Sequence, residues 1–208
     1  MTRRIAKAPL IALIGAVALA GCATSSREEP DASASAPMPA KHAATSRAPT
    51  LGGATIDPAA DIVTNAAKAP NLTIFVKAIQ AADLSAMLSG PGPYTVFAPT
   101  NDAFGRLAPG TVDTLLKPEN KASLVKLLQY HVIAGALSSN QLRDRIAAGG
   151  GTTVLTTVEG GQLTATLSGT IITLTDVNGN KSYIEASDVP QSNGIIHVVN
   201  GVMIPDLA

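Results

Sequence analysis

The chain has 208 residues, which is enough for one well-cored domain with appended segments. Hydrophobic residues make up 46% of it, but aromatic residues only 3% and there is no Trp, so Ala, Val, Leu and Ile must build the core. The formal net charge is zero and the sequence holds no basic cluster, which argues against a nucleic-acid partner.

The N-terminal segment has the form of a lipoprotein signal. Basic residues precede an apolar run, residues 8–20, that is too short to span a bilayer comfortably. The sequence Leu19-Ala20-Gly21-Cys22 resembles the lipobox of bacterial lipoproteins. This resemblance implies that residues 1–21 are a signal peptide and that the sulfur of Cys22 then carries a diacylglyceryl group. The alternative is an ordinary signal peptide followed by an incidental cysteine.

Residues 22–53 are predicted to form a lipidated, disordered linker. Ala, Ser, Thr and Pro dominate this segment, which cannot bury enough apolar surface to offset the entropy lost on ordering. As a flexible coil it would reach about 30 Å. Acyl chains on Cys22 make the membrane an expected partner, and Ala23 favours sorting to the outer membrane of a two-membrane cell. The expected location is the cell envelope, facing either the periplasm or the cell surface.

The first part of the following domain, residues 54–208, shows helical periodicity. Its apolar residues recur at intervals of three and four, and candidate capping residues precede several of the runs. Asp57-Pro58 and Asp61 suggest a first helix with proline in its first turn. The other predicted helices cover residues 72–79, follow a cap at Asp83, open at Pro118, and start from a cap at Ser138 or Ser139.

A strand over residues 94–98 interrupts these helices. Its side chains alternate between two faces that are both apolar, which predicts a central strand and not an edge. Pro99 ends the strand because proline cannot donate to a β-ladder. Either Thr100 or Asn101 then caps a short helix that includes Phe104.

From residue 152 onwards the apolar period changes from about 3.6 to 2. Turn dipeptides such as Asn178-Gly179 separate the segments, as expected of hairpins. The predicted strands are residues 152–158, 162–167, 170–175, 182–186 and 195–199. Helices in the first half and strands in the second indicate an α+β arrangement.

Three stretches carry a family resemblance: residues 94–104, the pair Tyr130-His131, and residues 193–205. Together they resemble the fasciclin (FAS1) domain family and follow one another in the family's order. The motif positions are Tyr94, Phe97, Pro99, Thr100, Asn101, Phe104, Tyr130, His131, Asn193, Gly194, His197 and Asn200. The resemblance implies a fasciclin-like β-sandwich (wedge) with a layer of short α-helices, in agreement with the α+β pattern.

His131 and His197 are the candidate pair for chemistry. A metal site would need further ligands, and no cysteine thiol remains once Cys22 is lipidated. The favoured interpretation is structural, because a buried histidine must hydrogen-bond its ring nitrogens to avoid a desolvation loss. The resemblance suggests the Asn101-Asp102 segment as the partner of His131.

The remaining polar motif residues also have a structural interpretation. Asn101, Asp102, Asn193 and Asn200 could contact a ligand, but each lies beside a turn or helix start that needs a capping oxygen. The chain lacks a phosphate-binding loop, a Gly-x-Ser-x-Gly elbow and a His-Glu-x-x-His motif. We therefore expect no catalytic residue, cofactor or metal, and do not expect an enzyme.

These features predict a non-catalytic, lipid-anchored module for adhesion or protein–protein binding, with a protein or glycan partner that the sequence does not identify. The alternative is a periplasmic ligand carrier or assembly factor attached to the outer membrane, which would need an apolar pocket with a few convergent polar groups. A hydrolase, the third hypothesis, would need a reactive nucleophile that no motif supplies.

Overall fold

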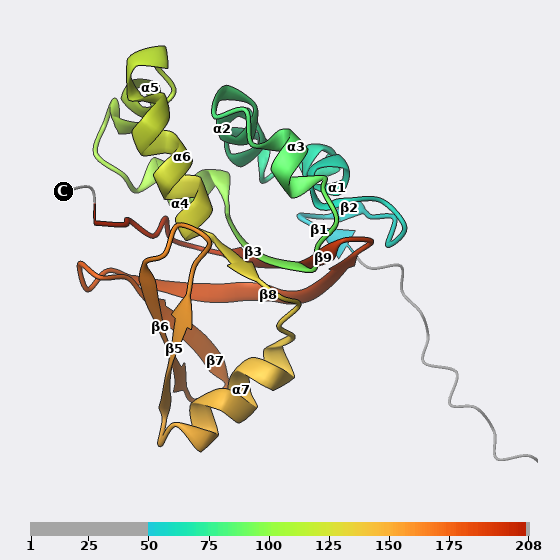
Figure 1. Cartoon of the computed structure of the whole chain (residues 1–208), viewed down its shortest axis with the longest axis vertical. Helices are drawn as coiled ribbons and strands as arrows, with labels where there is room; N and C mark the ends of the chain where they lie inside the picture. The colour runs from blue at the N-terminus through green and yellow to red at the C-terminus, as the bar shows by residue number, and fades with distance from the viewer. Residues whose placement is uncertain (1–49, 207–208) are drawn as a thin grey trace, which may run out of the picture. The chain divides into compact units, whose positions relative to one another are not determined.

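The computed structural model describes residues 50–206, shown in Figure 1. Its helices are α1 (Ile62–Lys68), α2 (Thr73–Ala81), α3 (Ser85–Leu88), α4 (Asn101–Gly105), α5 (Thr111–Leu115), the 3₁₀ helix η1 (Pro118–Asn120), α6 (Lys121–Tyr130) and α7 (Ser139–Ala148). Its strands are β1 (Thr50–Leu51), β2 (Ala54–Thr55), β3 (Tyr94–Pro99), β4 (Val132–Ala134), β5 (Thr152–Thr156), β6 (Gln162–Ser168), β7 (Ile171–Thr175), β8 (Lys181–Gln191) and β9 (Gly194–Val199). The predicted α+β arrangement is confirmed.

One mixed sheet organises the domain. Its strand order is β4-β3-β9-β8-β7-β6-β5, and β1 and β2 form a separate hairpin. The neighbours β3 and β9 run parallel, in register from Tyr94 opposite Gly194 to Pro99 opposite Val199. All other pairs in the sheet are antiparallel. Two segments about a hundred residues apart therefore form the centre of the domain.

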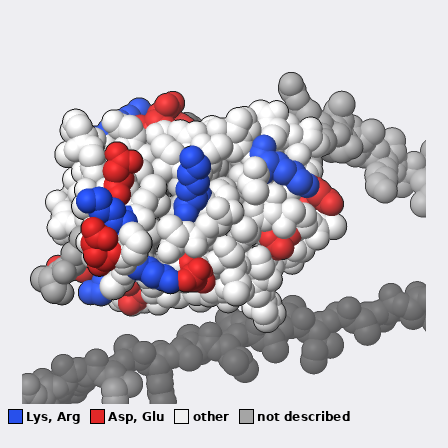
Figure 2. Space-filling view, turned by 90° about the horizontal axis from the view of Figure 1, so that it is seen from above, with Lys and Arg blue, Asp and Glu red and all other residues white. Residues whose placement is uncertain are grey.

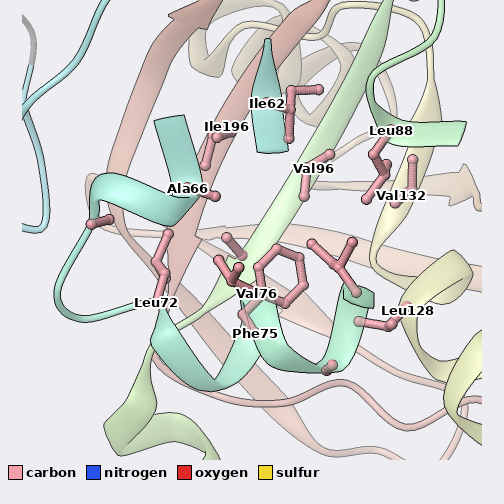
Figure 3. Close-up of a cluster of buried hydrophobic side chains, with 14 of the residues drawn as sticks. Ile62, Ala66, Leu72, Phe75, Val76, Leu88, Val96, Leu128, Val132 and Ile196 are labelled. Atoms are coloured by element: carbon pink, nitrogen blue, oxygen red, sulfur yellow. The ribbon is translucent and has the colours of Figure 1, made fainter. Parts of the chain in front are cut away.

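β3 and β9 separate two hydrophobic clusters, because alternate residues of each strand point to opposite faces. Val96 and Ile196 face the helical layer, where they pack with Phe75 of α2 and Leu128 of α6 (Figure 3). The other face holds the second cluster, which joins Phe97, Val199, Leu142, Ile146, Leu155, Leu163, Ile172 and Leu174. Figure 1 shows the same division, with α2, α3 and α6 on one side of β3 and β9 and with β5–β7 and α7 on the other.

β8 links the two halves of the sheet. Its first residues pair with β7, and its later residues pair with β9 across two register shifts around Ala186. Such bulges bend a strand and increase its twist, which folds the sheet over the second cluster. The predicted strand stopped at residue 186, because the bulge and Pro190 break the alternation that sequence analysis relies on. Pro190 is tolerated because β7 does not reach this part of β8.

The structure identifies the capping residue at each helix for which the sequence offered two candidates. Thr100 caps α4 by accepting from the Ala103 amide at 3.2 Å. Ser138 caps α7 and forms a reciprocal capping box with Gln141. The helix predicted to start at Asp57-Pro58 and Asp61 begins at Ile62 with Asp61 as its cap, so Pro58 lies before the helix and not in its first turn.

Two expectations about the first half were wrong. Asp83 does not cap a helix: its backbone is left-handed (φ +56°), and its carboxylate pairs instead with Lys121. The predicted linker extended to residue 53, yet Leu51 in β1 is fully buried in the helical cluster. A single apolar residue among small and polar ones gives no periodic signal, so the sequence could not reveal this contact.

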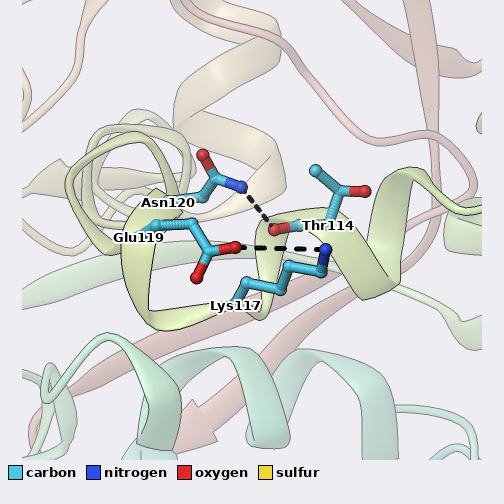
Figure 4. Close-up of polar contacts among 4 residues, drawn as sticks. All are labelled: Thr114, Lys117, Glu119 and Asn120. Atoms are coloured by element: carbon cyan, nitrogen blue, oxygen red, sulfur yellow. Dashed lines mark hydrogen bonds and ion pairs between the residues drawn. The ribbon is translucent and has the colours of Figure 1, made fainter.

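The surface of the helical layer carries charges of both signs. Figure 2, which looks onto this side, shows Lys and Arg interspersed with Asp and Glu. Between α5 and α6, Asn120 donates to the Thr114 carbonyl at 2.7 Å, and Lys117 lies 3.9 Å from Glu119 (Figure 4). Such exposed ion pairs contribute little stability. Within residues 50–206, no helix is both long and apolar enough to cross a membrane.

The close approach of β3 and β9 requires glycine at their N-terminal ends. A Cβ at Gly194 would lie 2.0 Å from the Tyr94 carbonyl oxygen, a backbone atom that cannot give way. We expect Gly194→Ala to lower the free energy of unfolding by about 3 kcal/mol. Gly105→Ala is the matched control, because nothing lies within 4 Å of its added carbon. Urea denaturation compares the two, and equal stability for both variants would contradict this packing constraint.

Candidate functional site

His131 is fully buried and bridges two backbone segments through its ring. Nδ1 lies 2.8 Å from the Leu127 carbonyl oxygen, and Nε2 accepts from the Met203 amide at 3.1 Å. A ring that donates through one nitrogen and accepts through the other is neutral. The partners are thus α6 and the C-terminal segment, and not the Asn101-Asp102 segment that the resemblance suggested. The sequence could not show this, because Met203 lies 72 residues away.

His197 makes an equivalent bridge in the opposite tautomer. Nε2 lies 2.8 Å from the Leu137 carbonyl oxygen, and Nδ1 accepts from the Asp188 amide at 3.2 Å. The ring also stacks on Phe97, with 5.5 Å between ring centroids. Burial lowers the pKa of His197, which keeps the ring neutral near pH 7.

The structure does not bring the two histidines into a metal site. All four ring nitrogens are engaged with backbone groups. No group of three His, Cys, Asp or Glu side chains within residues 50–206 could hold a metal ion. Both histidines instead join distant segments through the second hydrophobic cluster.

Tyr130 joins the end of α6 to the strand-rich half. Its hydroxyl donates to the Gln162 carbonyl at 2.6 Å and accepts from the Val177 amide at 3.3 Å. Burial raises the pKa of this hydroxyl, so it stays protonated. A Cβ at Gly161 would lie 2.7 Å from the Tyr130 ring, so glycine is needed beneath it.

Asn101 and Asn193 act as caps, but for helices far away in the chain. The Asn101 side-chain oxygen accepts from the Ile74 amide at 3.0 Å in α2, which has no cap of its own. The Asn193 oxygen accepts from the Ile62 amide at 3.1 Å, and its nitrogen donates to the Leu88 carbonyl at 2.7 Å. These two asparagines therefore attach α1, α2 and α3 to the ends of β3 and β9.

A small polar hollow lies where β3 and β9 end. Its volume is about 230 Å³, and its lining residues are Asn71, Thr100, Asn101, Asp102, Arg106, Glu185 and Asn200. Arg106 donates to the Asn200 carbonyl at 3.1 Å, and Asn200 accepts from the Tyr183 amide at 2.9 Å. The hollow brings motif positions from the first and closing segments together.

Two structural carboxylates were missed by the sequence analysis. Asp188 accepts from the amide (2.7 Å) and hydroxyl of Ser139, which ties the β8 bulge to α7. Burial alone would raise the pKa of Asp188, but these hydrogen bonds outweigh it and lower the pKa. Asp176 holds the β7–β8 turn and accepts from the Ile204 amide at 2.9 Å. The turn dipeptide Asn178-Gly179 was the available signal for Asp176, whereas nothing local marks Asp188.

Residues 70–205 match the family model described as the Fasciclin domain, which is more than half of the chain. The chain belongs to the fasciclin domain family. This range includes every motif position identified from the sequence, so the predicted family is confirmed.

Relatives at the sequence level include bacterial and animal proteins. Protein sll1483 of Synechocystis sp. (strain ATCC 27184 / PCC 6803 / Kazusa) is 40% identical over 167 residues, which cover 78% of this chain and 83% of that protein. Transforming growth factor-beta-induced protein ig-h3 of Sus scrofa is 33% identical over 136 residues, 64% of this chain but 17% of that protein. Immunogenic protein MPB70 of Mycobacterium bovis (strain ATCC BAA-935 / AF2122/97) is 32% identical over 115 residues, 55% of this chain and 51% of that protein.

A solved structure confirms the fold. The FAS1 domain pair from the insect cell adhesion molecule Fasciclin I matches with a TM-score of 0.61 at 17% identity. The match covers 72% of this chain and 51% of that structure, so this chain spans about half of the pair. The fasciclin-like wedge with its layer of short helices is therefore the fold of this domain.

Buried His131 should make the domain sensitive to acid. Burial lowers its pKa from 6.5 to about 4, so the unfolded chain takes up the proton first as the pH falls. The stability it contributes is fully present above pH 6.5 and is lost towards pH 4, a decrease of about 3 kcal/mol. Urea denaturation at both pH values should show a smaller decrease for His131→Gln. A ring pKa near 6.5 in an NMR titration of the native protein would contradict this assignment.

Proposed function

We propose that this chain is a lipid-anchored module of the cell envelope that binds other proteins through its surface, without bond chemistry. The observation that carries the proposal is the use of the motif side chains inside the domain. The hydrogen-bonding side-chain atoms of His131, His197 and Asn193 are all engaged with backbone groups, and each residue has at least one partner more than 50 residues away. Such side chains hold a scaffold together and are not available for catalysis.

Exposed apolar side chains support a binding role for the strand-rich half. The large apolar side chains exposed in the described part of the chain are Val154, Val158, Leu167, Ile171, Val177 and Tyr183. All of them fall within one segment, residues 154–183, and none lies in the helical layer. The strand-rich half therefore carries the large apolar side chains that a protein partner would bury.

Relatives support the same class of function. The solved FAS1 pair comes from a protein described as a cell adhesion molecule. The hollow where β3 and β9 end fits a ligand carrier less well, because it measures about 230 Å³ and polar residues such as Asn101 and Arg106 line it. A larger hollow of about 440 Å³ beside Gly92 and Asn193 is lined by proline, glycine, alanine and polar residues, without a large apolar side chain. Small-molecule sites are mostly apolar and occupy about 300–1,000 Å³.

Anchoring rests on Cys22 and the segment that follows it, which lie outside the described residues. Two or three acyl chains on this cysteine would hold the protein stably on a membrane, whereas one chain binds reversibly. The linker would then separate the domain from the lipid surface, so that the domain reaches its partners.

Replacing the acylated cysteine tests the anchor. We expect Cys22→Ala to move the protein from the membrane fraction to the soluble fraction of lysed cells, because the sulfur that carries the lipid is lost. Ser25→Ala, three residues further on, is the matched control and should stay with the membrane. Membrane retention of Cys22→Ala would contradict lipid anchoring.

Cross-linking on intact cells tests the binding role. A membrane-impermeant cross-linker followed by mass spectrometry should recover conjugates of the wild-type chain with matrix or neighbouring-cell proteins. Capture only by a permeant reagent, with periplasmic proteins alone, would favour the carrier or assembly factor instead.

A further inference from the structure

The curled sheet leaves an open seam between its two edge strands, β4 and β5. The edges meet at one point, where the Val158 amide donates to the Val132 carbonyl at 2.8 Å. Within residues 50–206, this is the only backbone hydrogen bond that joins the two edges. The sheet is thus closed at one end of the seam and open at the other.

The backbone groups along the seam point into it. In an antiparallel ladder, alternate residues direct both their N–H and C=O groups towards the partner strand. The bonds from Phe97 to His131 and from Gly135 to Pro93 show that the odd-numbered residues of this stretch face β3. Ala134 therefore presents its N–H and C=O to the seam.

The backbone groups of β5 that face the seam follow from its pairing with β6. The Thr157 amide donates to the Gly161 carbonyl at 2.9 Å, so residues 153, 155 and 157 face β6. Val154 and Thr156 then direct their N–H and C=O groups away from β6, as the bond made by Val158 also indicates. Each edge of the seam offers unpaired backbone donors and acceptors, the groups that template an added strand.

A groove of about 400 Å³ occupies the open part of the seam. Its walls include Ala134 and Ala136 on one side and Val154 and Thr156 on the other, with Arg145 of α7 also in its lining. Val154 is 55% exposed, so an apolar side chain lies beside the open backbone edge.

Arg145 gives the groove a positive charge. Its side chain lies in the last turn of α7 and is exposed. The ion pairs of the described region, Lys117–Glu119 and Lys121–Asp83, do not involve it. A carboxylate entering the groove would therefore find an accessible cation.

We propose that an extended peptide segment of a partner protein, bearing an acidic side chain, inserts into this groove as an added strand. Its backbone pairs with the open groups of Ala134, Val154 and Thr156, and its carboxylate pairs with Arg145. Because β4 and β5 are antiparallel across the seam, the strand runs parallel to one edge and antiparallel to the other. Strand addition of this kind takes affinity from main-chain hydrogen bonds and specificity from side-chain contacts. The inference rests on the proposed protein-binding function and names the surface that performs it.

Selection from a phage-displayed random heptapeptide library tests the proposal, with the complete mature chain held in detergent as bait. We expect selected peptides to share an acidic residue and a β-strand composition. Thr156→Pro removes the N–H that faces the groove but leaves the ladder with β6 intact, so it should raise the Kd of a synthetic selected peptide about tenfold. Thr152→Pro is the matched control, because it removes an edge-facing N–H outside the groove and should leave the Kd unchanged.

A second pair of variants tests the charge without touching the backbone. Arg145→Gln should weaken the same peptide about two- to fivefold, and should do so less at high salt. Arg143→Gln on the same helix is the control, because Arg143 does not line the groove and donates to the Thr170 carbonyl. Native circular dichroism and thermal unfolding verify that each variant is folded.

Several results would overturn the proposal. These are a library without enriched peptides, peptides that bind all four variants equally, and a seam already protected from hydrogen exchange by residues 22–49 or by a second copy of the chain. If these tests fail while cross-linking on intact cells still captures surface proteins, the groove is wrong but the binding function stands. Failure of the cross-linking alone would remove the function and leave the peptide site as a property of the isolated protein.

Discussion

The parallel pairing of β3 with β9 is the constraint on which the rest of the domain depends. These strands come from segments about a hundred residues apart, and their opposite faces support the two hydrophobic clusters. Bringing such distant segments together is entropically costly, and extensive burial must offset that cost. Gly92 and Gly194 allow the backbones to approach, because a Cβ on either would lie 2.0 Å from a backbone oxygen.

Side chains at the ends of β3 and β9 connect this strand pair to other elements of the domain. Asn193 connects the start of β9 to α1 and α3, and Asn101, just beyond β3, connects to α2. His131 and His197 do the same inside the second cluster, where an unpaired ring nitrogen would be costly. Polar groups thus specify which elements meet, while apolar burial supplies the main stabilisation.

Most features that depend on a local sequence pattern were predicted, with the cap at Asp83 as an exception. The central strand at residues 94–98, a helix start near Asp61, the cap at Thr100 or Asn101, and the strands after residue 152 all follow from periodicity and turn chemistry. The sequence did not predict the parallel neighbour of β3, the distant helices capped by Asn101 and Asn193, or the burial of Leu51, because these depend on which segments meet. The polar side chains of the motifs were expected to be structural. Their long-range hydrogen-bond partners could not be predicted from local sequence.

We expect the motif segments to behave as one cooperative unit. Native-state hydrogen exchange of the backbone amides in β3 and β9, compared with urea unfolding of the same protein, tests this most directly. If the strand pair holds the domain together, its slowest amides exchange only through global unfolding, and the two free energies agree within about 1 kcal/mol. Exchange of these amides through an opening several kcal/mol below global unfolding would show that the domain survives without the pair, which would contradict the account.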